Sequence, residues 1–117
     1  MLATTIEQSE TLIRIGVDIN TADMYWQRVG AFEYELRILN ERDKKHCFDY
    51  NIPAWSLSAL IDLVSGIKDI LYVSHSFNSY EHSFIARSKE STCVTAEDDP
   101  ISACVKLLHS LIKPRLI

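Results

Sequence analysis

Two serines near the middle of the chain are the first side chains whose setting could support chemistry. Residues 52–64 read IPAWSLSALIDLV and place Ser56 and Ser58 beside Trp55. A catalytic serine on a nucleophile elbow needs a G-x-S-x-G turn, because glycines tolerate the crowded, strained backbone there. No glycine flanks these serines, and serine is a favourable N-cap for the helix that the following residues predict. The sequence favours a structural role for Ser56, and it predicts no catalytic residue.

Histidines and cysteines are the next candidates, because their nitrogen and sulfur atoms bind transition metals. His75 and His82 face each other if residues 69–77 and 81–88 form a hairpin, and Cys93 would supply a third ligand. The spacing matches no recognised metal motif. A ligand, metal or enzyme site in a His75/His82/Cys93 cleft is therefore the alternative hypothesis, and no metal or cofactor site is predicted.

The other cysteines point to structure rather than reactivity. Three cysteines without a CxxC pair do not indicate a disulfide framework. Cys104 falls on the apolar stripe of the last predicted helix, where cysteine acts as a small hydrophobe. Cys47 follows Lys44 and Lys45, which could lower the pKa of its thiol, but we expect a solvated loop there.

Carboxylates are numerous but have structural explanations. Glu33 and Glu35 lie on the solvent-facing side of the strand predicted at residues 31–39. Asp23 fits a turn or a helix cap. The acidic run at residues 97–99 suits the N-terminus of a helix. Only three glycines occur, far apart, so no phosphate-binding loop is expected. An enzyme is therefore not the leading prediction.

Length and composition indicate one domain, residues 1–117, with ordinary globular proportions of 47% hydrophobic and 24% charged residues. The formal net charge of -4 argues against a general nucleic-acid binder and is too small for a DNA mimic. The chain shows no signal peptide and no apolar run long enough to cross a membrane. We therefore expect a cytoplasmic protein without a membrane or cofactor partner.

Periodicity and capping signals predict an alternation of helices and hairpins. Thr5 and Gln8 form a capping box, and Ser56 and Asp99 are further N-caps. The expected helices cover residues 6–15, 57–65 and 100–113, and the expected strands cover residues 24–29, 31–39, 69–77, 81–88 and 92–95. Helix followed by hairpin thus occurs twice. The fold class is α+β with two layers: a mainly antiparallel sheet of four or five strands and about three helices, in the order α-β-β-α-β-β-(β)-α.

Three sequence words carry a resemblance that spans nearly the whole chain: GVDINTADM, IPAWSLSALIDLV and DDPISACVKLLHSLI. With them the chain resembles a family of short uncharacterised bacterial proteins from gut anaerobes, often linked to phage or other mobile elements. The residues at 101–104, Ile-Ser-Ala-Cys, depart from the IDAA of that family. The resemblance implies a shared fold and a bacterial, mobile-element origin, and it implies no biochemical activity.

Aromatic side chains are the remaining pointer to function. They gather around the first predicted hairpin and the entry to the middle helix: Tyr25, Trp26, Phe32, Tyr34 and Trp55. Most are expected in the core, and any that helices leave uncovered would form a patch suited to a partner. The leading hypothesis is a small non-enzymatic module that binds another protein or a second copy of itself.

Overall fold

The computed structural model describes residues 2–40, 47–49, 51–78, 80–89 and 91–112. Within them the chain is α+β, as predicted, with three α-helices and two three-stranded antiparallel sheets. The elements in chain order are α1 (Ile6–Arg14), the 3-10 helix η1 (Ile19–Thr21), β1 (Met24–Arg28), β2 (Tyr34–Ile38), β3 (Ile52–Ala54), α3 (Leu57–Ser65), β4 (Ile70–Phe77), β5 (His82–Ser88), β6 (Thr92–Glu97) and α4 (Pro100–Ile112).

The strands form two separate sheets, so the prediction of one sheet with four or five strands is wrong. The first sheet has the order β2-β1-β3 and the second has the order β4-β5-β6. Both predicted hairpins exist. In each sheet the third strand is the next strand along the chain, β3 in the first sheet and β6 in the second. Alternation along a strand indicates local pairing, and it carries no information on whether two hairpins share a sheet.

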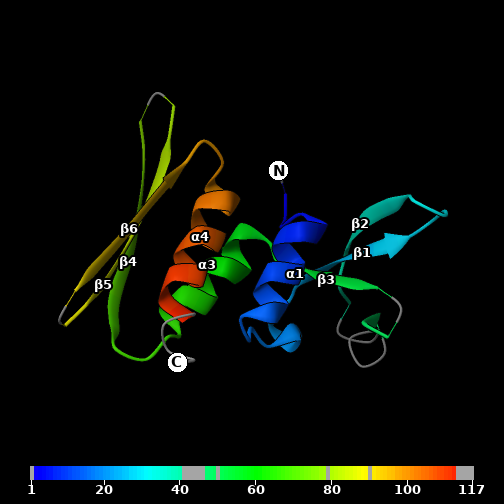
Figure 1. Cartoon of the computed structure of the whole chain (residues 1–117), viewed down its shortest axis with the longest axis horizontal. Helices are drawn as coiled ribbons and strands as arrows, with labels where there is room; N and C mark the ends of the chain where they lie inside the picture. The colour runs from blue at the N-terminus through cyan, green and yellow to red at the C-terminus, as the bar shows by residue number, and fades with distance from the viewer. Residues whose placement is uncertain (1, 41–46, 50, 79, 90, 113–117) are drawn as a thin grey trace.

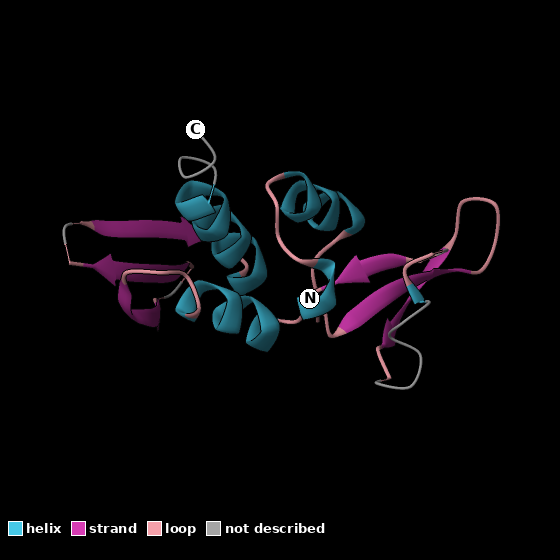
Figure 2. Cartoon of the chain, turned by 90° about the horizontal axis from the view of Figure 1, so that it is seen from below, coloured by secondary structure: helices cyan, strands magenta, loops and turns pink. Residues whose placement is uncertain are grey.

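The two sheets lie at opposite ends of the molecule, with the helices between them (Figures 1 and 2). The principal extents are 45 × 34 × 25 Å and the radius of gyration is 14.7 Å. A compact chain of this length is expected near about 13 Å. The excess reflects the first sheet, which contacts α1 on one side of the helical layer and projects away from the rest.

The predicted helix signals are confirmed at the N-termini. Thr5 and Gln8 form the reciprocal capping box of α1, and the Ser56 hydroxyl accepts a hydrogen bond from the Ala59 N–H at the start of α3. The Asp99 carboxylate accepts from the Ser102 N–H at the start of α4. Gly16, just after α1, has φ +99°, the left-handed conformation that ends helices.

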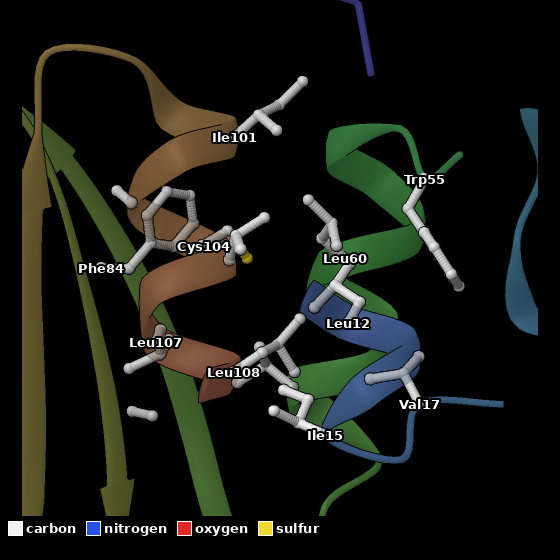
Figure 3. Close-up of a cluster of buried hydrophobic side chains, with 14 of the residues drawn as sticks. Leu12, Ile15, Val17, Trp55, Leu60, Phe84, Ile101, Cys104, Leu107 and Leu108 are labelled. Carbon is white, nitrogen blue, oxygen red and sulfur yellow. The ribbon is translucent and has the colours of Figure 1, made fainter. Parts of the chain in front are cut away.

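The core lies where α4 meets its neighbours on two sides. Phe84 of β5 is buried against α4 from the second sheet, while Leu12, Leu60 and Leu108 meet where α1, α3 and α4 converge (Figure 3). The sequence predicted one apolar stripe on α4. Because the helix is covered on two sides, Ala103 and Leu107 are fully buried as well.

No helix among the described residues is long and apolar enough to cross a membrane. Several predicted features fall outside the described part of the chain. These are Lys44 and Lys45, which precede Cys47, and residue 113, the expected end of the last helix.

Candidate functional site

One face of the first sheet gathers apolar side chains that the helices leave open. Antiparallel pairing places Met24 opposite Ile38, Trp26 opposite Leu36 and Arg28 opposite Tyr34. Directly paired residues point to the same side of a sheet. We call the apolar members of this side the first-sheet face: Met24, Trp26, Tyr34, Leu36 and Ile38.

The first-sheet face becomes more exposed with distance from α1. Trp26 is half-buried, and its indole Nε1 donates to the Thr4 carbonyl at 2.9 Å, which ties that part of the sheet to the N-terminal segment. Ile38 on the outer strand β2 is 79% exposed. Phe32, in the turn between β1 and β2, is 95% exposed, and Val29 beside it is also exposed. The hairpin therefore presents large apolar side chains to solvent.

The reverse side of the same sheet is polar. Tyr25 pairs with Arg37 and Gln27 pairs with Glu35, and the Arg37 guanidinium forms an ion pair with the Glu35 carboxylate. The sheet is thus amphipathic, as its alternation predicted. The strand expected at residues 31–39 is observed as Tyr34–Ile38. Its apolar side is mostly exposed, because among the described residues of β2 only Leu36 is partly buried.

The aromatic residues of this region separate into a core member and surface members. Trp55 is fully buried, Tyr25 and Trp26 are half-buried, and Phe32 and Tyr34 are exposed. The expectation that most of them are core is therefore wrong. The sequence did not identify Ile38 as a surface residue. The alternation along the strand nevertheless predicts that Ile38 lies on the same side of the sheet as Tyr34.

His75 and His82 do face each other across the second hairpin. His75 Nε2 lies 2.8 Å from His82 Nδ1, and the two rings are inclined by only 14°. Phe84 flanks the His75 ring at 4.4 Å between centroids, and Phe77 flanks the His82 ring at the same distance. Burial, and then the neighbouring His82, lower the pKa of His75 below its ordinary value. Above that pKa the His75 ring is neutral and hydrogen-bonded to the His82 ring.

Cys93 does not complete a metal site with this pair. It pairs with Ala86 in the strand register, whereas His75 pairs with Phe84 and His82 with both Phe77 and Glu97. No group of three or more histidine, cysteine or carboxylate residues in the described part of the chain is arranged to hold a metal ion. Burial raises the pKa of the Cys93 thiol, which disfavours the thiolate that a metal would need.

The remaining cysteines behave as buried residues. Cys104 is fully buried, as predicted, and burial raises its pKa to about 12. Cys47 is also buried, so the expectation of a solvated residue there is wrong. The Asn51 side-chain amide donates to the Cys47 carbonyl at 2.9 Å. Phe48, the residue after Cys47, packs on the core cluster. None of the three cysteines forms a disulfide.

Ser56 is hydrogen-bonded to Asp23, and we call this Asp23–Ser56 contact the clasp. Its backbone N–H donates to Asp23 Oδ1 at 2.8 Å, and its hydroxyl donates to Asp23 Oδ2. One residue earlier, the Trp55 indole donates to Thr21 Oγ1 at 3.0 Å, and the Trp55 N–H donates to Thr4 Oγ1 at 3.1 Å. The TAD segment at residues 21–23 and the AWS segment at residues 54–56 are therefore in contact. Asp23, predicted as a local turn or cap residue, instead holds the start of a distant helix.

A groove of about 630 Å³ lies beside this clasp, between the end of α1 and helix α3. Its floor is apolar, with Val17, Leu63 and Ile67 among the lining residues. Asp18 and Asp23 are on its rim, but each carboxylate already accepts hydrogen bonds within the fold, from Asn20 and Ser56 respectively. The groove therefore offers an apolar hollow without a set of polar groups converging on a ligand.

Comparison of this chain with protein-family models, with curated proteins and with solved structures found no match. The first-sheet face is the strongest candidate for a functional site on the described part of the chain.

Proposed function

We propose that the chain is a non-enzymatic module that binds another protein through the first-sheet face. The observation that carries the proposal is an amphipathic sheet at one end of the molecule, whose apolar side the described residues cover only in part. Exposed apolar area costs roughly 25 cal/mol per Å² relative to burial. A contiguous apolar patch bordered by polar residues is typical of a protein interaction site.

The chemistry of the face favours a protein partner over a nucleic acid. Aromatic and aliphatic residues supply the rigid anchors that dominate protein interfaces. Among the described residues, Arg28 is the one cation paired into this side of the sheet, whereas binding a phosphate backbone requires several cations. Arg28 also donates to the carbonyls of Gly30 and Ala31 within the turn. The partner we propose presents an apolar surface of its own.

The proposal is tested by comparing two double variants as immobilised baits in extracts of the cells that make the protein. Phe32→Ser with Ile38→Ser removes the exposed Ile38 of the first-sheet face together with the exposed Phe32 of the turn that precedes β2. Tyr80→Ser with Val94→Ser makes the same kind of change at the opposite end, where both residues are also exposed. We expect one protein to be retained by the wild type and the control but lost by the first variant, at unchanged stability. Equal retention by both variants would contradict the proposal.

A second candidate function is a metal or ligand site built on His75 and His82, favoured by the 2.8 Å contact between their ring nitrogens. A metal ion would take the place of the shared proton and complete its coordination with ligands from outside the pair. Zn²⁺ titration of the wild type, His82→Ala and the α4 control His109→Ala decides the matter. Stoichiometric binding that only His82→Ala abolishes supports this function. Absence of binding to the wild type rules it out.

A further inference from the structure

The two sheets expose four outer strands, and three of them carry features that discourage pairing with another chain. An outer strand offers unpaired backbone N–H and C=O groups, so proteins protect such edges with charge, proline or short length. On β2 the protection is the Glu35–Arg37 ion pair. On β3 it is Pro53 within a strand of only three residues.

The outer strand β6 is protected at one end. It ends in Glu97, which pairs with Lys106 of α4 at 2.9 Å, and it leads directly into Asp98 and Asp99. Any strand that pairs along the whole of β6 would have to lie beside this acidic end. Charge therefore disfavours pairing along β6.

The outer strand β4 has none of these protections. It is eight residues long, reads ILYVSHSF, and contains neither proline nor a residue with a permanent charge. Six of its eight residues are exposed, among them Leu71, Tyr72 and Phe77. One irregularity, between Ile70 and Tyr72, interrupts its pairing with β5. From Tyr72 to Phe77 the strand is regular and open along one side.

We infer that β4 is a dimerisation strand, and that two copies of the chain join their β4 strands antiparallel into one continuous six-stranded sheet. An uncharged edge is compatible with itself, because no like charges meet when a second copy approaches about a two-fold axis. The pairing uses the β4 edge of both copies and leaves the acidic ends of β6 outside. The assembly therefore closes at two chains. It lies at the opposite end of the molecule from the first-sheet face and does not depend on the proposed function of that face.

The first test is sedimentation equilibrium of the full chain across a concentration series. We expect the wild type to reach twice the 13.4 kDa chain mass. Ser74→Glu adds a charge on the exposed side of β4, opposite Ile85, and should raise the dimer dissociation constant about tenfold or more. Thr92→Glu is the matched control, with the same charge change on β6 beside Arg87. It should leave the dissociation constant unchanged.

Three results would overturn the inference: a wild type that stays at the mass of one chain at every soluble concentration, growth beyond two chains, or equal weakening by both variants. Amide hydrogen exchange of the wild type provides a second test that needs no substitution. We expect protection of the β4 amides to rise with protein concentration while that of the β2 amides stays constant. Concentration-independent exchange of β4 in a sample that sediments as a dimer would place the interface elsewhere and refute the role of β4.

Discussion

His75 shows how a single side chain couples the second hairpin to pH. Its ring is held between the His82 ring nitrogen and the face of Phe84. Burial, and then the electrostatic effect of His82, both disfavour the charged form of the His75 imidazole. The pKa of His75 is therefore below the ordinary 6.5.

NMR titration of the His75 ring protons should give a pKa below 6.5, and His82→Asn should move it back toward that value. The sign for stability follows from the same shift. Above pH 6.5 the ring is neutral in both states. As the pH falls through 6.5 the unfolded chain takes up the proton first, so stability decreases until the folded pKa is reached. A His75 pKa at or above 6.5 in the wild type would refute this environment.

The Asp23–Ser56 contact predicts a coupling between two distant positions. Ser56→Ala removes both the N-cap of α3 and a donor to Asp23, and should cost about 1–2 kcal/mol of unfolding free energy. Asp23→Ala should show a coupling energy with Ser56→Ala of at least about 0.5 kcal/mol in urea denaturation. Thr5→Ala is the control, because Thr5 caps α1 and its effect should add to that of Asp23→Ala. Additivity of Asp23→Ala with Ser56→Ala would contradict the clasp.

Elements were predictable where their signals were local. Capping residues, the Gly16 stop and strand alternation all act within a few residues, and the structure confirms the helices and hairpins they predict. Contacts made across the chain were not predictable from such signals. The Asp23–Ser56 clasp, the burial of Cys47 and the separation of the two sheets depend on which elements pack together. The open first-sheet face is of this kind, since alternation predicts an apolar side without saying what covers it.

The end of α1 provides a prediction at the level of the element. Gly16 has φ +99° and its added Cβ would meet nothing within 4 Å, so any cost of Gly16→Ala is conformational. We expect a loss of about 1–2 kcal/mol in chemical denaturation. Gly30→Ala is the control, because its φ is not in the left-handed region and its Cβ would make only ordinary contact with Glu33. Equal effects of the two substitutions would show that Gly16 does not hold this conformation.

Over the described residues the chain repeats an α-helix followed by three strands, but the two units are built differently. The second sheet is a simple meander, β4-β5-β6, whereas in the first sheet β3 pairs with β1 and leaves β2 outside. The second sheet lies directly against α4 and shares its core with Phe84 and Ala86. The first sheet contributes few buried side chains, which leaves its apolar side available.

This difference predicts unequal stability along the molecule. Regions with few buried contacts open locally at lower free energy than the core. Native-state hydrogen exchange should therefore give the β1 and β2 amides a lower opening free energy than those of α4, whose Leu107 and Leu108 are fully buried. Identical opening free energies in both regions would show that the first sheet is as well supported as the core.

Benzoylphenylalanine, a photo-crosslinking aromatic residue, placed at Phe32 tests directly whether this hairpin binds a partner. Phe32 lies in the turn of the first hairpin and is 95% exposed. In the cells that make the protein, we predict a cross-link to one partner protein. That cross-link should be lost on adding Ile38→Ser and absent when the same residue replaces the exposed Glu10 of α1. Indistinguishable products from positions 32 and 10 would contradict the claim that the first-sheet face is a binding surface.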